Sequence, residues 1–239
     1  NNADTCIGGF KRVFSNRTEE HTNPLAGKVF NKDNIKDEIL VRMLGKRSNG
    51  ADNLEMSVWK ILFSNKIIKE NNIRFPSERV YISEDIVFDL EYYSKAKCVC
   101  MSDFNGYCYC DNEGTLTTKY NSERYKKQKF LYDYLCKRTK ELGIYNDSKE
   151  RMMTTLIAIA RYSIQLEVKF MGKNGKSHAE NKIKEICYDD ELNKIFSVYN
   201  NKAVPFKYRM MNNMIKNKNI KLLMFLWSLK FRKKGNSYD

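Results

Sequence analysis

The chain has 239 residues, of which 42% are hydrophobic and 30% charged, a composition typical of a globular protein that excludes a disordered one. Its 43 basic and 29 acidic residues give a net charge of +14, and residues 201–239 contribute ten basic residues against a single acid. This excess predicts an anionic partner from one of three classes: nucleic acid, an acidic membrane surface or a phosphorylated substrate.

Cysteine usage and hydropathy exclude two further classes of protein. The seven cysteines are an odd number in a chain of this length, which disfavours a secreted disulfide scaffold and favours reduced thiols in the cytoplasm. The longest apolar run, residues 222–227, is far shorter than the ~18 residues that a membrane-spanning helix needs. We therefore expect a cytoplasmic protein. Because the chain begins with Asn1 directly before a strand, we also expect it to be an internal fragment.

The first half of the chain mixes strands and helices. In order, the pattern predicts a strand at 4–14, a polar loop at 16–24, a short strand at 28–30, a helix from Asp33 or Asn34 to Gly45, and a loop at 46–53. Residues 55–61 fit a helix and a strand equally well. They precede a short helix at 65–71, a helix at 84–95, strands at 97–101 and 106–110, and a loop at 111–118.

The second half is nearly all helix. The pattern predicts helices from Ser122 to Gly143, from a capping box of Asp147 and Glu150, around 179–187, at 190–199 and at 207–232, with a polar loop at 172–177. This change of pattern predicts two domains, 1–120 and 121–239. The expected fold class is α/β, with a mixed sheet and flanking helices followed by a mainly α-helical C-terminal subdomain.

Residues 81–93 place two adjacent carboxylates, Glu84 and Asp85, where a loop turns into an amphipathic helix. Ser83 is the expected N-cap. A purely structural interpretation suffices for this stretch alone, because the helix macrodipole favours carboxylates in the first turn. The same dipole would keep Asp85 ionised. The flanking sequence adds a chemical interpretation.

Three blocks in order carry a resemblance to a known family. The first is Met56-Ser-Val-Trp-Lys-Ile-Leu-Phe63 with a basic segment ending in Arg74-Phe75-Pro76; the second is Ser83-Glu-Asp-Ile-Val-Phe88; the third is Tyr107-Cys-Tyr-Cys110 with Gly114-Thr-Leu-Thr117. Together they are similar to the C-terminal half of a bacterial family-2 glycosyltransferase, an inverting enzyme of the GT-A fold. The resemblance covers residues 4–120 and implies a partial GT-A-like sheet.

The resemblance also implies roles for individual residues. Asp85 would be the base that takes the acceptor's proton, and Glu84 would orient the acceptor or Asp85. Acceptor or donor contacts would come from Trp59, Lys60, Tyr109 and Thr115. Two of these have equally simple structural interpretations, because Trp59 fits a core position and Lys60 a solvated or salt-bridged cation. Where the family has an Arg near the donor's diphosphate, this chain has Cys110, so the phosphate contact is open.

The implied substrates are a nucleotide sugar, with UDP as the expected nucleotide, and a glycan or lipid-linked acceptor in capsule or surface polysaccharide synthesis. The family holds Mn²⁺ or Mg²⁺ with a D-x-D element after a hydrophobic strand, and the chain has no such element. The resemblance places that half before Asn1. We therefore expect the metal and donor site in the intact enzyme and no transferase activity from this chain alone.

Two alternatives rest on other residues. Cys98, Cys100, Cys108 and Cys110, if their strands are neighbours, could surround Zn²⁺, although buried thiols are the simpler interpretation. The basic amphipathic segment 207–234 suits an anionic membrane surface, which predicts a peripheral position on the inner face of the plasma membrane. The rival to an enzyme is a non-catalytic basic module that binds such a membrane or nucleic acid. The chain carries no recognised nucleic-acid signature, and we expect no nucleic-acid partner.

Overall fold

The computed structural model describes residues 2–52, 54–110 and 120–235, with side chains up to Phe231. The chain forms two compact units. Unit 1 comprises residues 1–44, 53–119 and 137–148, and unit 2 comprises residues 45–52, 120–136 and 149–239. Strands and helices mix in unit 1, and unit 2 is helical, so the predicted fold class is confirmed. The assignment of 1–120 and 121–239 as domains stays a prediction.

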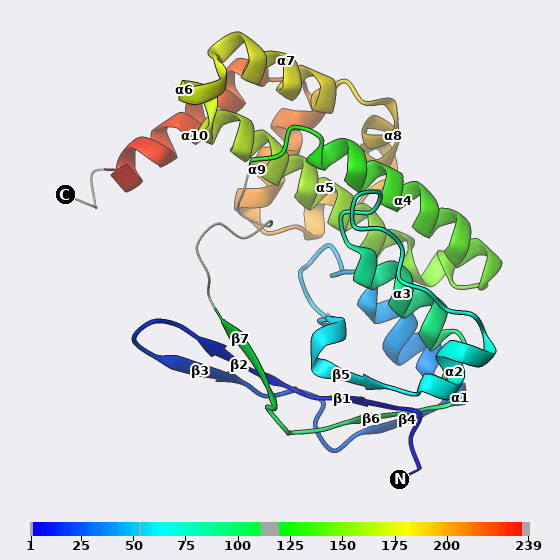
Figure 1. Ribbon diagram of the computed structural model, residues 1–239. Helices are drawn as coiled ribbons and strands as arrows, with labels where there is room; N and C mark the ends of the chain where they lie inside the picture. Colours follow the sequence, from blue (N-terminus) through cyan, green and yellow to red (C-terminus); the bar gives the residue numbers. More distant parts are fainter. Residues whose placement is uncertain (1, 53, 111–119, 236–239) are drawn as a thin grey trace. The chain divides into compact units, whose positions relative to one another are not determined.

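Two small mixed sheets organise unit 1 (Figure 1). The four-stranded sheet has the order β4-β6-β1-β5, with bounds Val29–Asn31, Cys98–Met101, Thr5–Ile7 and Ile61–Phe63. The three-stranded sheet has the order β3-β2-β7, with bounds Thr18–His21, Phe10–Val13 and Tyr107–Cys110. β1 and β6 are parallel, as are β2 and β7, so the same two chain segments run side by side through both sheets.

The Gly8-Gly9 pair is where the first of these segments crosses from one sheet to the other. A Cβ atom on Gly8 would lie 2.7 Å from the carbonyl oxygen of Phe104, and one on Gly9 would lie 2.3 Å from that of His21. Only glycine allows backbones to approach this closely. The predicted strand at 4–14 is therefore confirmed as two strands, β1 and β2, joined at the glycines.

The predicted polar loop at 16–24 is wrong in its middle. Residues 18–21 form β3, which pairs antiparallel with β2 in a hairpin. A tight turn closes the hairpin, in which the Phe14 amide donates to the Arg17 carbonyl at 2.8 Å. Neither face of β3 is deeply buried, and all four of its residues are polar. The sequence therefore lacks the alternation of hydrophobic and polar residues by which a strand is recognised.

Helices cover one face of the four-stranded sheet. α1 (Lys32–Ile35) continues into a π-helical turn, η1 (Lys36–Val41), and its cap is Asn31, whose side chain accepts from the Asp33 amide, instead of the expected Asp33 or Asn34. α3 (Glu84–Tyr93) buries Phe88 and Leu90. Its Tyr92 hydroxyl bonds to the Thr5 hydroxyl at 2.9 Å, which ties α3 to β1.

The segment that precedes β5 resolves the ambiguity at 55–61. Val58–Lys60 is a 3-10 turn, η2, which leads directly into β5, so both helical and extended backbone occur there. The short helix α2 (Asn65–Glu70) follows and confirms the helix predicted at 65–71. Ser83 occupies the N-cap position of α3, but its side chain makes no capping hydrogen bond, so that part of the prediction is wrong.

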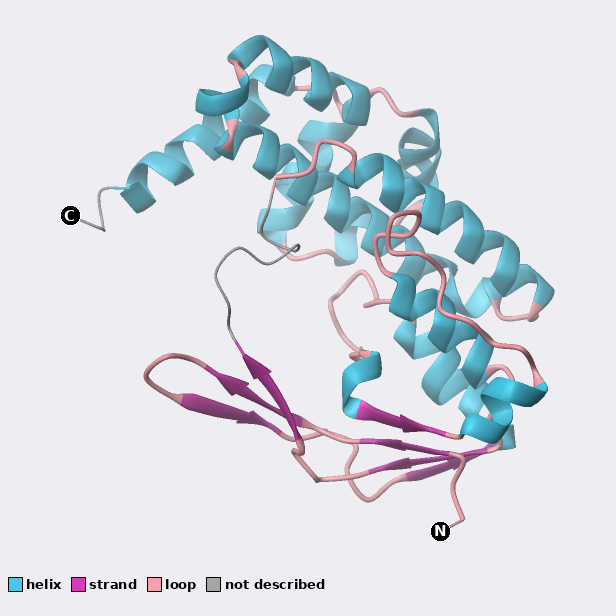
Figure 2. Cartoon of the chain, viewed as in Figure 1, coloured by secondary structure: helices cyan, strands magenta, loops and turns pink. Residues whose placement is uncertain are grey.

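The described part of the second half of the chain is helical (Figure 2). The helices are α4 (Arg124–Glu141), α5 (Tyr145–Lys169), α6 (Met171–Asn174), α7 (Lys176–Cys187), α8 (Asp190–Val198), α9 (Phe206–Lys216) and α10 (Ile220–Gly235), with a 3-10 turn η3 (Asn201–Ala203). The predicted loop at 172–177 is wrong, because α6 and the first turn of α7 lie there. Asp189 caps α8 by accepting from the Leu192 amide at 2.9 Å.

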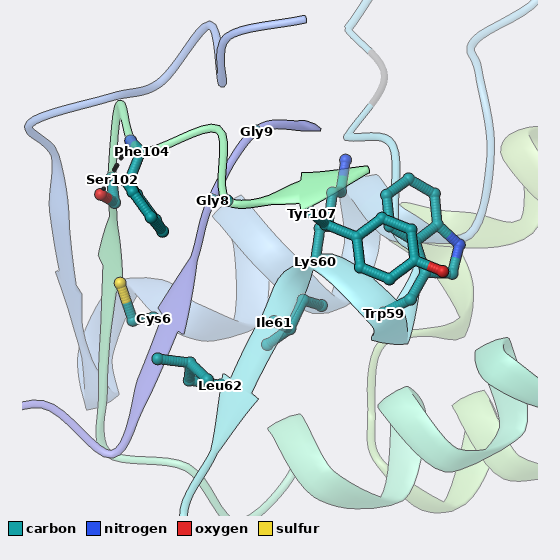
Figure 3. A pocket seen from close by; sticks show the side chains of 11 residues that line it. Cys6, Gly8, Gly9, Trp59, Lys60, Ile61, Leu62, Ser102, Phe104 and Tyr107 are labelled. Atoms are coloured by element: carbon teal, nitrogen blue, oxygen red, sulfur yellow. Dashed lines mark hydrogen bonds between the residues drawn. The ribbon is translucent and has the colours of Figure 1, made fainter. Parts of the chain in front are cut away.

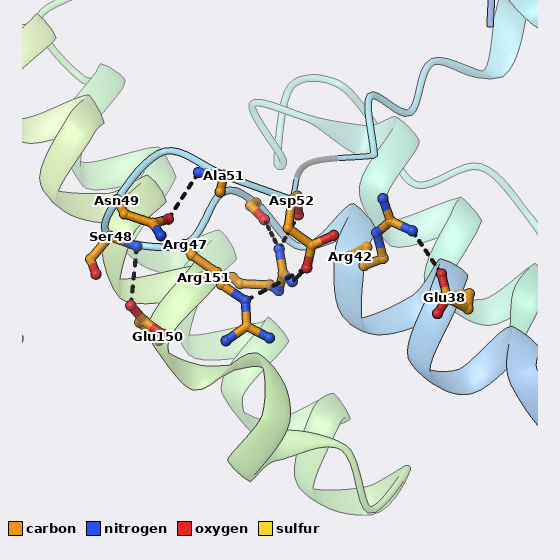
Figure 4. A network of polar contacts seen from close by, with 10 residues as sticks. Glu38, Arg42, Arg47, Ser48, Asn49, Ala51, Asp52, Glu150 and Arg151 are labelled. Carbon is orange, nitrogen blue, oxygen red and sulfur yellow. Dashed lines mark hydrogen bonds and ion pairs between the residues drawn. The ribbon is translucent and has the colours of Figure 1, made fainter. Parts of the chain in front are cut away.

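Two expectations about helix ends are corrected. The single helix predicted at 207–232 is two helices, α9 and α10, because Lys218 adopts a left-handed conformation with φ of 57° that ends α9. The capping box of Asp147 and Glu150 does not form, since α5 already begins at Tyr145. Glu150 instead accepts from the Ser48 amide at 3.1 Å (Figure 4). Among the described residues, no helix is long and apolar enough to cross a membrane.

Candidate active site

The first turn of α3 holds the two carboxylates that the sequence singled out. Glu84 and Asp85 are both partly exposed, and the backbone amide of Val58 lies close enough to the Asp85 carboxylate to favour its charged form. Val58 begins the η2 turn that carries Trp59 and Lys60. The predicted base therefore lies near the chain segment of two predicted binding residues.

Burial raises the pKa of the Asp85 carboxyl, and the charge of neighbouring Glu84 raises it further, against a smaller opposite effect of the Val58 backbone amide. The net direction is opposite to that expected from the helix N-terminus alone. A carboxylate with a raised pKa is a stronger base than an ordinary aspartate. Glu84 thus affects Asp85 through its charge.

One functional candidate was missed in the sequence. Asp89 lies one helical turn after Asp85 and is completely buried, at 0% exposure. Neither of its carboxylate oxygens has a hydrogen-bond partner among the described residues. Burial holds the pKa of Asp89 well above its ordinary range, the Asp85 charge adds to this, and the Lys60 charge opposes it. The signal for Asp89 in the sequence is its position among the apolar residues of α3, because a carboxylate there becomes buried with them.

We expect Asp89→Asn to stabilise the protein more at pH 8 than at pH 4. The raised pKa means that the folded state binds a proton that the unfolded state releases, so stability falls as the pH rises from the ordinary aspartate pKa through the raised one. Each unit of raised pKa corresponds to about 1.4 kcal/mol. Asn has no such titration. Thermal melting at both pH values measures the difference, and the exposed Asp37→Asn serves as control; equal shifts in the two variants would contradict the prediction.

Trp59 lies in a cluster of aromatic rings on one face of the three-stranded sheet. Its ring centroid is 4.5 Å from that of Tyr107, 5.5 Å from that of Tyr109 and 5.0 Å from that of Phe10. Tyr107 and Tyr109 alternate with cysteines along β7, so the two tyrosines share a face, as expected. Trp59 is partly exposed, which leaves part of its ring accessible.

A cavity of about 260 Å³ opens beside this cluster. Figure 3 shows the rings of Trp59 and Tyr107 together at one end of it and Phe104 towards the other. The lining residues come from both sheets and from η2: Cys6, Gly8, Gly9, Trp59, Lys60, Ile61, Leu62, Ser102, Phe104, Gly106 and Tyr107. An aromatic wall in a small cavity suits the apolar face of a ring-shaped ligand.

Lys60 lies between the cavity and the buried Asp89 carboxylate, whose charge acts on it. It lines the cavity, and its Nζ lies 5.8 Å from the centroid of the Phe10 ring. Burial lowers the pKa of Lys60, while the charges of Glu55 and Asp89 raise it. Lys60 is partly buried and makes no ion pair within the described part of the chain, so it is neither fully solvated nor salt-bridged.

Not every predicted residue joins this site. Glu84 and Asp85 are absent from the described lining of the cavity, although Asp85 lies near Val58, which directly precedes the lining residues Trp59 and Lys60. Thr115, with the rest of the block at 114–117, lies outside the described residues. Cys110 is exposed at the end of β7, so its position contributes no fixed cation.

The zinc alternative fails on topology. Cys98 and Cys100 belong to β6 and Cys108 and Cys110 to β7, and these strands lie in different sheets. Cys100 pairs instead with Cys6 on β1, where burial and the neighbouring thiol raise the pKa of Cys6 to about 11. Within residues 2–52, 54–110 and 120–235, no group of three or more His, Cys, Asp or Glu side chains could hold a metal ion. These residues do not fit Mn²⁺ or Mg²⁺, which stays a prediction for the intact enzyme.

The chain was compared with known proteins. No family model matches it, and no curated protein matches it. Among solved structures, it is similar to the crystal structure of S. aureus TarS 1–349 in complex with UDP-GlcNAc, with a TM-score of 0.45 and 15% sequence identity. That match covers 97% of this chain and 60% of the TarS chain, so the present chain spans about three fifths of its length. A likeness at this level identifies no family, and the residues of the chain itself carry the proposal below.

Proposed function

We propose that the chain carries the acceptor and base side of an inverting glycosyltransferase that uses a nucleotide sugar, with UDP as the expected nucleotide. The acceptor would be a glycan or a lipid-linked glycan of a bacterial surface polysaccharide. The observation that carries the proposal is the position of Asp85. It is a partly exposed carboxylate of raised pKa near the Val58 amide, which directly precedes Trp59 of the aromatic cluster.

In this mechanism the acceptor hydroxyl oxygen attacks the anomeric carbon, and its proton passes to the Asp85 carboxylate. The bond from the anomeric carbon to the diphosphate breaks, and its electron pair leaves with the nucleoside diphosphate, so the anomeric configuration inverts. A base in this step must be within hydrogen-bond reach of the hydroxyl and largely ionised at working pH. Asp85 is accessible to an acceptor, whereas Asp89 is completely buried.

The other site residues support this assignment. The exposed part of the Trp59 ring, with Tyr107 beside it, offers a flat apolar surface to the face of a sugar ring. Lys60 supplies a positive charge between the cavity and the carboxylates, and Asp89 faces the same charge from within the core. Glu84 raises the pKa of Asp85 and therefore its strength as a base.

The test uses the natural protein, purified from the cells that produce it, and measures transfer of labelled sugar from a panel of UDP-sugars to glycan or lipid-linked acceptors. NMR determines the anomeric configuration of the product. An inverted product supports the proposal. A retained configuration, or no transfer to any glycan or lipid-linked acceptor, would overturn it. The donor and metal site is proposed to lie outside these 239 residues, so measurable turnover by the isolated chain would contradict that part of the proposal.

We further propose that α10 brings the protein to an anionic membrane, which suits a lipid-linked acceptor. The predicted apolar residues of the C-terminal helices divide into two groups. Met214 and Leu223 are buried inside unit 2, whereas Leu222 and Leu229 on α10 are exposed, at 44% and 38%, as is Phe225 at 58%. These exposed residues share one helical face, flanked by basic residues of the same helix.

Phe225→Glu is expected to weaken binding to vesicles containing phosphatidylglycerol by about tenfold or more. It removes apolar area that the membrane would bury, and it adds a negative charge that the anionic lipids repel. Sedimentation with vesicles measures the effect. Val198→Glu on α8 is the matched control, since Val198 is 71% exposed and is likewise an apolar residue replaced by an acid. Equal losses in both variants would show that net charge alone determines binding and would refute α10 as the contact.

A further inference from the structure

A second cavity lies entirely within unit 2, among α5, α9 and α10. It has a volume of about 260 Å³, and the proposed active site shares no residue with it. Its lining includes two cations, Arg161 and Lys207, and no acidic residue among those described. Tyr162, Tyr208 and Trp227 supply aromatic surface. A cavity that combines two cations with aromatic walls differs from an ordinary packing defect, which is apolar.

Arg161 is the central group of this cavity. Its Nη1 donates to Oδ1 of Asn212 at 2.6 Å, and its guanidinium carbon lies 4.8 Å from the centroid of the Tyr208 ring. Within the described part of the chain it forms no ion pair with a carboxylate. A guanidinium has five N–H donors, so this single hydrogen bond leaves donors available for a ligand.

The partner of Arg161 is fixed in place. Asn212 is completely buried and donates in turn to Oδ1 of Asn201 at 2.8 Å. This neutral network orients the guanidinium without neutralising its charge. Burial lowers the pKa of Arg161, which reflects the cost of holding that charge with incomplete compensation. Because arginine remains protonated in proteins, the site keeps its cation.

The start of α9 adds to the positive potential. Lys207 and Tyr208, which line the cavity, belong to the first turn of this 11-residue helix. Pro205 precedes the helix, no side chain caps it, and its first turn has no acidic residue. No residue of α9 therefore compensates the positive end of its helix dipole, which lies next to Arg161 and Lys207.

We propose that this cavity binds a phosphate monoester whose ring or apolar part packs against Tyr208 and Trp227, with the phosphate on Arg161 and Lys207. The planar guanidinium can bind two phosphate oxygens at once, and Lys207 provides a second charge. The volume limits the ligand to a small molecule or to the head of a larger one. The proposal is independent of the transferase activity, because it uses no residue of the Asp85 site.

The test is isothermal titration calorimetry of the folded protein with phenyl phosphate, a monoester that carries a ring, and with phenol as the neutral analogue. Arg161→Gln is expected to weaken phenyl phosphate binding by at least about tenfold, because a charge-assisted hydrogen bond is lost. Gln removes the charge and keeps a polar side chain at this position. Lys207→Gln is the second variant, on an exposed side chain, and carries the test if Arg161→Gln does not fold.

Arg209→Gln is the matched control, because it removes one charge from the same helix at a residue outside the cavity. Equal weakening by Arg209→Gln and by the cavity variants would overturn the proposal, as would phenol binding as tightly as phenyl phosphate. Asp85→Asn is expected to leave phenyl phosphate binding unchanged, so this test and that of the transferase fail or succeed separately.

A phosphate monoester could come from solution or from a lipid headgroup, and a second arm separates the sources. Vesicles of phosphatidylcholine with phosphatidic acid, which carries a phosphate monoester, are compared with vesicles of phosphatidylcholine alone. Loss of binding to the phosphatidic acid vesicles in Arg161→Gln but not in Arg209→Gln supports the site with a lipid ligand. If Arg161→Gln weakens binding of phenyl phosphate but not binding to the vesicles, the site is supported with a soluble ligand. Binding of neither probe overturns it.

Discussion

Replacing Asp85 by Asn is expected to lower kcat for sugar transfer by about 10²- to 10⁴-fold, with little change in KM for the donor. This is the range that a positioned general base contributes. Asn preserves the size of the side chain but cannot take the acceptor's proton. The measurement is steady-state transfer by the protein as its cells make it, with circular dichroism and thermal melting to show that the variant is folded.

The raised pKa of Asp85 adds a second readout to the same experiment. A base must be deprotonated, so kcat/KM is expected to rise with pH through the pKa of Asp85 and to lose that limb in Asp85→Asn. Glu84→Gln removes the charge that helps to raise this pKa, so the limb should move to lower pH with only a modest change in maximal rate. Asp37→Asn, on an exposed helical position, controls for loss of one negative charge. Unchanged transfer by Asp85→Asn would refute Asp85 as the base.

Much of the site could be predicted because its residues lie in short local segments. The α3 helix start and the β7 strand with Tyr109 each have a pattern that can be recognised over a few residues, whereas the η2 segment with Trp59 is recognised only by its resemblance to a family motif. Their spatial association rests on strand order. β1–β2 and β6–β7 run parallel through both sheets, and no local pattern in the sequence reports such pairing.

The sequence was misleading where burial and polarity disagree. Lys60 was interpreted by its charge and Asp89 was overlooked among apolar neighbours, yet the two interact electrostatically in the partly buried interior of unit 1. β3 was interpreted as a loop because both of its faces are polar. In each case the determining quantity was solvent exposure, which depends on tertiary packing rather than on residue type.

The predictions of helix boundaries were wrong for a related reason. The capping box of Asp147 and Glu150 matched a known pattern, but Glu150 is used to bind the Ser48 amide across about a hundred residues of chain. The break between α9 and α10 depends on the left-handed conformation of Lys218, a residue type that gives no warning of it. Long-range contacts and single backbone conformations of this kind have no signature in periodicity.

Loss of the Arg151 side chain should strongly destabilise unit 2. Its side chain is only 2% exposed, and its guanidinium donates to the carbonyl oxygens of Gly45 and Asp52 and contacts the Asp52 carboxylate (Figure 4). These bonds hold the loop at residues 45–52 against α5. Arg151→Met is expected to lower the free energy of unfolding by about 3–5 kcal/mol, since two backbone acceptors and a carboxylate lose their partner.

Urea denaturation followed by circular dichroism measures this loss. Lys149→Met, two residues earlier in α5 and exposed, removes the same charge and should change the free energy of unfolding by less than about 0.5 kcal/mol. A similar small change in Arg151→Met would show that the loop does not depend on the guanidinium.

The Asp52 side of the pair is expected to behave differently from a surface ion pair, although its side chain is 37% exposed. Asp52→Asn keeps a residue type that tolerates the left-handed φ of 56° at this position, so it tests the charge and not the backbone. It leaves the buried Arg151 cation with only carbonyl partners, which costs more than the loss of an exposed pair. The double variant Asp52→Asn/Arg151→Met should therefore cost less than the sum of the two single changes, with a coupling of about 1–3 kcal/mol. Strict additivity would mean that the two side chains do not stabilise each other.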